Sequence, residues 1–404
     1  YRKEYDLPDA MSEHEVRQYF EELAEQNISL FCLSGLGAYD HYSPAVIPHI
    51  ISRSEFLTAY TPYQPEVSQG TLRYIFEYQS MITELTGMDC TNASMYDGAT
   101  ATAEAMFMMV ASAKKKNRVV ISATVADRVI NVVKTYAKFR GIDLTVAPEK
   151  DGITDFDAIK AELEAGDVAG VIVATPNKYG IVEDYTGYAD TIHAAKGMLA
   201  INADPSALAV LRTPKEWGAD IACGDGQSLG MPLCFGGPYL GYMSCSSATL
   251  RKMPGRVVGA TKDADGKRAF VLTLQAREQH IRREKATSNI CSNQSLMALY
   301  ATIYMALMGK EGMKEVNRLS ADGAHYLYNA LLATGKFEPA FPGKPFLKEF
   351  VVKTSLDIKA VNKKLEENGI MGGLDLGNGM VAFAVTEKRT KAEIDRLITL
   401  MTEE

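Results

Sequence analysis

Long hydrophobic runs are missing from this sequence. The longest mainly apolar stretch, residues 105–113, covers nine residues including Ser112 and stops at Lys114. A helix that crosses a bilayer needs about 20 apolar residues, so we expect no membrane span. No charged segment followed by an apolar one stands at the start, and we therefore expect no signal peptide. The chain begins at Tyr1 rather than Met, so a leading segment could lie outside the sequence given.

Cysteine and histidine are few and scattered. The six cysteines form no C-x-x-C pair, and the six histidines show no H-E-x-x-H spacing. A chain of 404 residues can bury a large core without disulfide bonds, and scattered cysteines are typical of a reducing compartment. We therefore expect a cytoplasmic protein without a zinc site.

Basic residues are too few for broad nucleic-acid binding. The net charge is −7 and the pI is near 5.6, whereas binding to a phosphate backbone requires a basic face. The one basic cluster, residues 114–116, is expected to cap the end of a helix and face water. Apolar residues make up 47% and charged residues 23%, which excludes a disordered chain. The length of 404 residues predicts two or three domains.

Short apolar strands alternate with helices through the middle of the chain. Uninterrupted apolar runs predict buried strands, and apolar residues at helical spacing predict helices. The expected strands are 119–122, 144–147, 168–174, 198–203, 221–223 and 239–243, and the expected helices are 72–86, 98–115, 127–140, 155–165 and 185–196. This alternation predicts an α/β domain with a mostly parallel sheet, in which ligands bind beyond the carboxyl ends of the strands.

The two ends of the chain have other patterns. Residues 1–34 are predicted to be helical, with a capping box at Ser12 and Glu15. Residues 34–70 are rich in Gly, Pro, Tyr and Ser, which predicts extended chain with short helices. The remaining predicted elements are a hairpin at 257–275, a long helix at 292–332, strands at 350–352 and 380–385, and helices at 358–367 and from 391. We therefore expect an N-terminal helix and extended interface segment (1–70), a large α/β domain (71–330) and a small C-terminal α+β domain (331–404).

A carboxylate and a glycine-rich turn follow neighbouring predicted strands. Asp204 ends one strand, and residues 225–230 (DGQSLG) and 235–241 (FGGPYLG) follow the next. This layout is similar to that of pyridoxal-phosphate enzymes of the aspartate-aminotransferase fold, where the strand-end Asp pairs with the ring nitrogen and a lysine forms the Schiff base. In the other interpretation, Asp204 caps a helix or turn and the glycines only bend the chain. Spacing alone does not decide between the two.

Several longer motifs resemble one family. These are residues 35–41 (GLGAYDH), 62–70 (PYQPEVSQG), 84–88 (ELTGM), 94–100 (SMYDGAT) and 283–291 (REKATSNIC). They resemble the glycine decarboxylase P-protein of the glycine cleavage system, over essentially all 404 residues. Some organisms have one long P-protein chain and others two homologous subunits, and this sequence is similar to subunit 1, the N-terminal half of the long form.

The resemblance implies a fold and an activity. It implies pyridoxal-phosphate fold type I, and an enzyme that condenses glycine with pyridoxal phosphate, releases CO2 and passes the aminomethyl group to the lipoyl arm of the H-protein. In the two-subunit form the cofactor lysine belongs to subunit 2, and two copies of each subunit are expected. The partners implied are therefore a homologous catalytic subunit and the lipoylated H-protein, with pyridoxal phosphate on the partner subunit.

The position of the Schiff-base lysine departs from the catalytic pattern. Where the catalytic half of the family has a His-Lys pair, this chain has Gly226 and Gln227. An amide nitrogen is conjugated to its carbonyl and cannot form an aldimine. Lys215 and Lys252 are interpreted as surface charges, which leaves Lys178, at a strand end, as the rival. We therefore expect no catalytic residue and no covalent cofactor in this chain alone.

The turn that would bind the cofactor phosphate also differs from the pattern of catalytic members of this fold. In this fold the cofactor phosphate binds at a helix N-terminus, but Asp97 places a like charge before Gly98 at that turn. Asp97 could instead cap the helix. With both anchors altered, we expect Asp204, Gln227 and Gly98 to be degenerate cofactor positions, and Asp204 to be structural.

The resemblance also implies a dimer interface at which subunits lend loops to each other's pocket. The segment 60–70 and the tip 95–97 are the candidates to be lent, because they are aromatic and polar. We expect Tyr63, Gln64, Tyr96 and Asp97 to face the partner's cofactor pocket, with simple interface packing as the alternative.

The sequence gives expectations for two histidines and one arginine, and it leaves two rival functions open. His41 and His193 are expected to be structural, and Arg283 to form an interface ion pair or to line the approach of the lipoyl arm. The rivals to a lysine-lacking subunit are a self-sufficient pyridoxal-phosphate enzyme that uses Lys178 and a purely structural scaffold.

Overall fold

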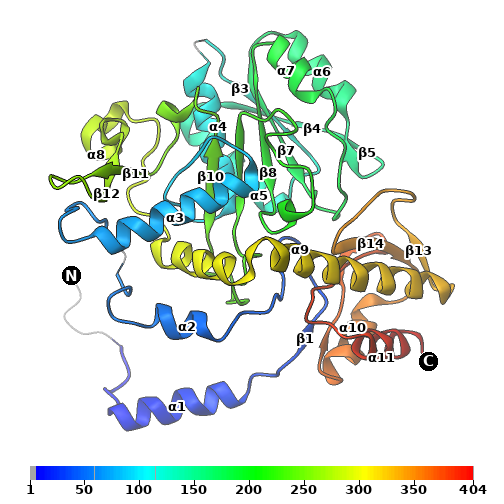
Figure 1. The fold of residues 1–404 in the computed structure, drawn as a ribbon. Coiled ribbons are helices and arrows are strands. Elements are labelled where there is room, and N and C mark those ends of the chain that lie inside the picture. The colour runs from blue at the N-terminus through cyan, green and yellow to red at the C-terminus, as the bar shows by residue number, and fades with distance from the viewer. Residues whose placement is uncertain (1–5, 59, 114, 404) are drawn as a thin grey trace.

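A seven-stranded sheet forms the centre of the molecule (Figure 1). The computed structural model describes residues 6–58, 60–113 and 115–403. The strand order is β2-β10-β9-β8-β7-β3-β4, parallel from β9 through β4, with β10 antiparallel to β9 and β2. The strands are β2 (Cys90–Thr91), β3 (Arg118–Ser122), β4 (Asp143–Ala147), β7 (Val168–Thr175), β8 (Met198–Ala203), β9 (Ile221–Asp225) and β10 (Gly241–Cys245). All eight residues of β7 are buried, as expected for a parallel strand covered on both faces.

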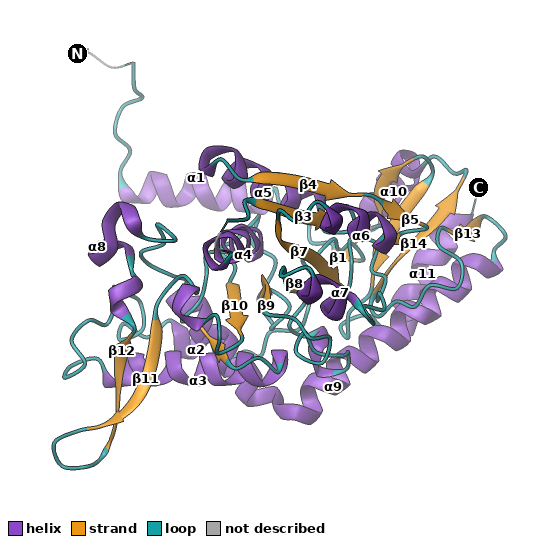
Figure 2. Ribbon diagram, turned by 90° about the horizontal axis from the view of Figure 1, so that it is seen from above, coloured by secondary structure: helices purple, strands orange, loops and turns teal. Residues whose placement is uncertain are grey.

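Helices cover both faces of this sheet (Figure 2). The alternating side chains of the strands divide the core: Cys223 and Met243 pack with α4 and α5, whereas Ala222 and Tyr242 pack with α3 and α9. The helices α6 and α7 cover the same face as α3 and α9. Their bounds are α3 (Gln69–Thr86), α4 (Gly98–Ser112), α5 (Asp127–Arg140), α6 (Phe156–Glu164), α7 (Tyr188–Ala194) and α9 (Ser295–Ala333).

A smaller lobe gathers at the C-terminal end of α9 (Figure 1). Its sheet has the order β13-β14-β17-β16, and α10 and α11 pack with it. The bounds are β13 (Phe337–Pro339), β14 (Glu349–Thr354), α10 (Ile358–Glu367), β15 (Ile370–Met371), β16 (Leu374–Gly377), β17 (Met380–Ala384) and α11 (Lys391–Thr402). The N-terminal strand β1 (Phe31–Cys32) pairs in parallel with β15. The division at 70 and 330 remains a proposal; α9 runs through the second boundary and joins the two lobes.

Smaller elements complete the chain. The predicted hairpin is formed by β11 (Val257–Lys262) and β12 (Arg268–Thr273), and α2 (Val46–Ile51) is a short helix in the irregular N-terminal region. The others are β5 (Glu149–Lys150), β6 (Ile153–Thr154), α8 (Gln279–Arg282), η1 (Ala207–Ala209), η2 (Leu250–Lys252), η3 (Gln275–Arg277) and η4 (Arg283–Lys285). No helix in the described part of the chain is long and apolar enough to cross a membrane.

The predicted helix over residues 1–34 is wrong at both ends, since the described residues 6–12 are not helical either. The capping box at Ser12 and Glu15 is confirmed, but α1 covers only Glu13–Glu25, and residues 1–5 lie outside the described residues. The side chains of Gln26 and Asn27 donate to carbonyls of the last helical turn and end the helix. None of the α1 residues is buried, and the helix lies apart from both lobes (Figure 1).

The basic cluster at 114–116 also differs from its prediction. Lys114 lies outside the described residues. Lys116 does not face water freely, because its Nζ donates to the carbonyls of Val168 at 3.0 Å and Ala195 at 2.6 Å. The cation therefore ties the end of α4 to the central sheet.

One turn brings the two lobes into close contact. After β7, Gly180 has a φ of +77° and lies against the backbone of Glu349, and Ile181 forms a β-bridge with Phe346. A Cβ at Gly180 would lie 2.0 Å from the Glu349 carbonyl oxygen. Only glycine fits this approach.

The helix α4 carries one buried acid. Glu104 is 7% exposed, and burial raises its pKa from 4.5 to about 7, although Ser288 and Arg140 oppose the rise. Because the folded state holds this proton more tightly than the unfolded chain, stability is lost as the pH rises from about 4.5 to about 7.

Replacing Glu104 with glutamine is expected to remove this pH dependence. Relative to the natural chain, the variant should gain about 2 kcal/mol more stability at pH 8 than at pH 5, because the amide is never ionised. Urea unfolding at the two pH values measures the difference. The exposed Glu366→Gln is the matched control, and equal pH profiles for the Glu104 variant and the natural chain would contradict the prediction.

Candidate functional site

Two carboxylates meet at the carboxyl edge of the sheet. Asp204 follows β8 and Asp225 ends β9, and these parallel strands pair directly. The N-terminus of α4 reaches the same edge, where the Gly98 N–H donates to Asp225 Oδ2 at 3.0 Å. The structure thus brings Asp204, Gln227, Asp97 and Gly98 to one edge, where a fold of this kind binds ligands.

Asp204 is paired with a lysine that the sequence analysis missed. Lys348 Nζ lies 2.7 Å from Asp204 Oδ2, and the lysine side chain is 1% exposed. Burial alone would raise the pKa of Asp204, but the ammonium of Lys348 and the hydroxyl of Ser228 hold it below its usual value. Lys348 immediately precedes β14, so this ion pair connects the small lobe to the large one. The available signal was a pair of charged residues, Lys348 and Glu349, between apolar neighbours in the run 346–350 (FLKEF).

The same lysine is surrounded by a polar network. Its Nζ lies 3.1 Å from His41 Nε2 and 4.0 Å from the centre of the Tyr39 ring. Burial and the charge of Lys348 lower the pKa of His41, so the neutral ring accepts from Lys348 and donates from Nδ1 to Glu387 Oε2 at 2.7 Å. His41 is therefore fully hydrogen-bonded within the chain.

Gln227 is held by backbone groups. Its side chain is fully buried; Oε1 accepts from the Tyr39 N–H at 2.8 Å, and Nε2 donates to the carbonyls of Tyr39 at 2.8 Å and Met231 at 2.7 Å. The amide uses its donors and its acceptor, which an amine could not do. Gln227 therefore fastens the loop around Tyr39 to the edge of the sheet.

The N-terminus of α4 is satisfied by the chain's own carboxylates. Asp97 Oδ1 accepts from the Thr100 N–H at 2.8 Å and forms a capping box, and Asp225 accepts from the N–H groups of Gly98 and Gln227. Burial raises the pKa of Asp225 to about 6. A Cβ on Gly98 would lie 2.6 Å from the Asp225 nitrogen, so α4 is packed tightly against β9.

These contacts do not fit pyridoxal phosphate. The cofactor requires a free amine, a helix N-terminus open to a phosphate and a carboxylate open to a ring nitrogen. Here Gln227 stands in the position predicted for the amine, Asp225 takes the helix N–H group, and Lys348 takes the carboxylate of Asp204. A lysine ammonium thus stands where the cationic ring nitrogen would bind, and an aspartate where the phosphate would.

Lys178, His193 and Arg283 form no ion pair with Asp204 or Asp225 in the described part of the chain. Lys178 Nζ is 3.5 Å from Asp127 Oδ1 and 3.4 Å from Glu149 Oε2. His193 pairs with Asp220 at 2.8 Å, and Arg283 is exposed in η4.

The tyrosines expected at an interface are accessible. Tyr63 is 39% exposed, Tyr96 is 37% exposed, and Gln64 is also exposed. The Tyr63 hydroxyl accepts from Arg256 Nη2 at 2.5 Å. The structure therefore places Tyr63 beside Arg256, a residue that the sequence analysis did not single out.

The family of this chain is shown by its similarity to known proteins. A family model described as "Glycine cleavage system P-protein" matches residues 1–401. The chain belongs to the glycine cleavage system P-protein family. A relative from Moorella thermoacetica, named "Probable glycine dehydrogenase (decarboxylating) subunit 1", is 50% identical over 405 residues, which cover 99% of this chain and 90% of that protein. A relative of the same name from Anoxybacillus flavithermus is 50% identical over 407 residues, with 98% and 90% covered.

Solved structures that resemble this chain include a member of this family and more distant proteins with the same fold. "Crystal structure of glycine decarboxylase (P-protein) of the glycine cleavage system, in inhibitor-bound form" has a TM-score of 0.92 and 40% identity, and covers 98% of this chain and 91% of that one. A sphingosine-1-phosphate lyase from Burkholderia pseudomallei has a TM-score of 0.72 at 14% identity, with 98% and 91% covered. A glutamate decarboxylase from Lactobacillus brevis has a TM-score of 0.74 at 13% identity, with 100% and 94% covered. The predicted pyridoxal-phosphate fold type I is confirmed.

Proposed function

We propose that this chain is the lysine-lacking subunit 1 of a two-subunit glycine dehydrogenase (decarboxylating), and that a homologous catalytic subunit holds the pyridoxal phosphate. The assembled enzyme then binds glycine through that cofactor, releases CO2 and transfers the aminomethyl group to the lipoyl arm of the H-protein. The names of relatives at 50% identity support the subunit assignment. The observation that carries the division of labour is the Lys348–Asp204 pair at 2.7 Å, beside a glutamine where the Schiff-base lysine is expected.

In this proposal the chain also completes its partner's pocket. Tyr63, Gln64 and Tyr96 are exposed, and Asp97 stands next to Tyr96 at the start of α4. Exposed aromatic side chains next to polar groups suit an interface that also touches a small ligand. The Arg256 hydrogen bond orients the Tyr63 ring before any partner arrives.

The two rival functions are less well supported. A self-sufficient enzyme would need Lys178 as its amine, but that ammonium lies between Asp127 and Glu149, whereas Asp204 is paired with Lys348. A purely structural scaffold would leave Tyr63 and Tyr96 without a role in turnover. Substitution of these tyrosines separates the scaffold from the proposed function.

Reconstitution tests the division of labour. The isolated chain, given stoichiometric pyridoxal phosphate, should show no aldimine absorbance and no borohydride-trapped lysine. The partner subunit is co-expressed and purified, and glycine–bicarbonate exchange is measured for each subunit and for the mixture. Exchange should require the mixture. A trapped adduct on Lys178 together with exchange by this chain alone would refute the proposal.

Tyr63→Phe and Tyr96→Phe test the pocket contribution. Each is expected to lower exchange by the assembled enzyme about tenfold with assembly intact, because one hydrogen bond near the reacting groups is lost. Tyr326→Phe is the matched control, since Tyr326 is also 37% exposed but bonds to Asp395 in the small lobe. Unchanged exchange in both test variants would favour the scaffold.

A further inference from the structure

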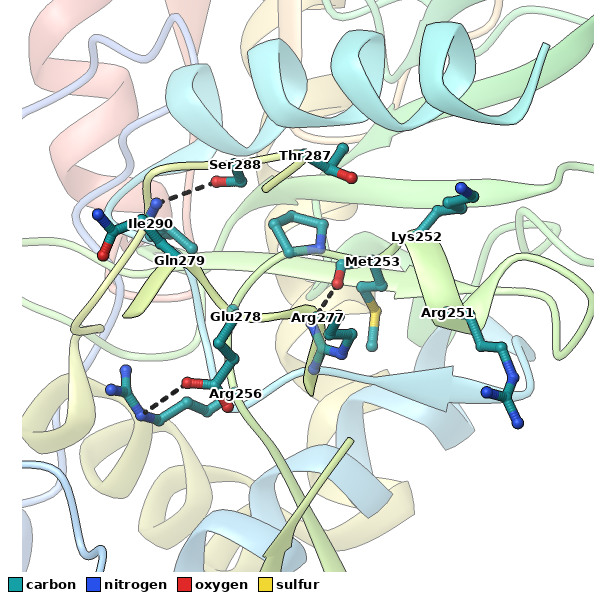
Figure 3. A pocket seen from close by; sticks show the side chains of 12 residues that line it. Arg251, Lys252, Met253, Arg256, Arg277, Glu278, Gln279, Thr287, Ser288 and Ile290 are labelled. Carbon is teal, nitrogen blue, oxygen red and sulfur yellow. Dashed lines mark hydrogen bonds and ion pairs between the residues drawn. The ribbon is translucent and has the colours of Figure 1, made fainter. Parts of the chain in front are cut away.

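A small cationic cavity lies beside the β11–β12 hairpin (Figure 3). Its volume is about 20 Å³, and its walls come from η2, the segment 253–256 before β11, residues 277–279 of η3 and α8, and the segment 287–290. The lining residues include Arg251, Lys252, Arg256, Arg277 and Glu278. The side chains of Arg251 and Lys252 extend away from Arg277 (Figure 3). Neither the Asp204 edge nor the predicted site residues take part in it.

Arg277 presents an unsatisfied edge. Its Nη1 donates to the Met253 carbonyl, whereas Nε and Nη2 are buried and have no hydrogen-bond partner in the described part of the chain. Nε and Nη2 form one edge of the planar guanidinium, which matches the two oxygens of a carboxylate. Burial lowers the pKa of Arg277, but a guanidinium still stays charged at neutral pH. Arg277 as a whole is only partly buried, but the shielding of Nε and Nη2 from water without a partner is costly, and an anion bound there would offset that cost.

The neighbouring carboxylate of Glu278 forms no ion pair with Arg277 among the described residues, although its Oε1 has no hydrogen-bond partner either. Glu278 Oε2 lies 3.7 Å from Arg256 Nε and 3.5 Å from His280 Nδ1. Figure 3 shows Glu278 directed to Arg256, while Arg277 is directed to Met253. Arg256 is 5% exposed and Glu278 is 8% exposed, so this pair forms a buried wall of the cavity. Among the described residues, the charge of Glu278 favours the cationic form of Arg277, but no carboxylate is hydrogen-bonded to its Nε and Nη2.

The size of the cavity limits what can bind. One water-sized sphere needs about 10–15 Å³, so a cavity of about 20 Å³ is too small for the four oxygens of a phosphate and has room for no more than the two oxygens of a carboxylate. We propose that this cavity is a carboxylate-binding site, in which Arg277 holds one carboxylate group through Nε and Nη2. The carboxylate comes either from a small free acid or from an Asp or Glu side chain of a neighbouring subunit.

The surroundings suit either source. Arg256 also bonds to Tyr63, and the nearby Tyr60 and Val67 are 76% and 80% exposed. The cavity therefore borders the surface that the proposed function assigns to the subunit interface. The side-chain source rests on that proposed function, whereas binding of a free acid does not.

Acetate is the probe for the isolated full-length chain. Thermal unfolding is followed in sodium acetate against sodium chloride at equal ionic strength, since a ligand that binds only the folded state raises Tm. Acetate should raise the Tm of the natural chain. Arg277→Lys keeps the charge but loses the bidentate edge, and should bind acetate at least about tenfold more weakly. Arg318→Met, on the exposed face of α9, is the control and should respond as the natural chain does.

The assembled complex then separates the two sources. If a partner carboxylate occupies the site, acetate no longer raises Tm in the complex and Arg277→Lys weakens assembly. If the ligand is a small free acid, acetate still binds in the complex and assembly is unchanged. No acetate-specific rise in the isolated natural chain, or an equal rise in Arg277→Lys, overturns the site. Neither result depends on whether the complex turns over glycine.

Discussion

Replacing Lys348 with methionine is expected to lower the free energy of unfolding by about 3–5 kcal/mol, because Asp204 is left as a buried charge without its partner. Methionine keeps the length of the apolar stem, so the loss reports the charge rather than a cavity. The ammonium and the carboxylate are 2.7 Å apart, with side chains 1% and 11% exposed. Guanidinium unfolding of the isolated chain at pH 7.5 measures the change.

Two controls show whether the ion pair is responsible. The double variant Lys348→Met with Asp204→Asn should recover part of the loss, since neither charge is then buried. Lys391→Met breaks an ion pair with Asp395 on an exposed helix face and should cost at most about 1 kcal/mol. If Lys348→Met costs no more than Lys391→Met, the pair does not hold the site together.

Replacing Gly180 with alanine is expected to lower the free energy of unfolding by about 4 kcal/mol. Two causes combine: the left-handed backbone at φ +77° costs a non-glycine residue about 1–2 kcal/mol, and a Cβ 2.0 Å from the Glu349 carbonyl oxygen forces backbone apart. The displaced backbone adjoins Lys348, so the variant should also disturb the Asp204 pair. Urea unfolding of the isolated chain measures the loss.

Gly187→Ala separates the two causes. Gly187 has a similar φ of +81°, but a Cβ there meets no atom within 4 Å. This control should lose only the conformational part, about 1–2 kcal/mol. Equal losses in the two variants would show that the close approach between the lobes contributes nothing.

The large sheet could be predicted from the sequence because its strands are buried on both faces. Such strands appear as uninterrupted apolar runs, and the predicted bounds 198–203 and 127–140 match β8 and α5. Where side chains rather than apolar periodicity decide the structure, the prediction failed. The polar caps at Gln26 and Asn27 end α1 early, and β1 and β15 are two residues long and 339 positions apart.

Only part of the candidate site could be predicted from the sequence. Gln227 and Asp97 stand inside recognisable motifs, so the altered anchors could be read from local residues. The ion pair between Lys348 and Asp204 could not be predicted from the sequence. Lys348 is 144 positions from Asp204 and reaches it only through the packing of β14 against the large lobe. The role of Arg277 could not be predicted for the same reason, because the lack of hydrogen-bond partners at its Nε and Nη2 depends on which residues surround it in the fold.

The ion pair of Lys348 with Asp204 also affects how the two lobes can move relative to each other. Many enzymes close around a substrate by swinging one lobe about a hinge. Here such a swing would pull the Lys348 ammonium away from the mostly buried Asp204 carboxylate, so this ion pair opposes movement of the small lobe relative to the large one.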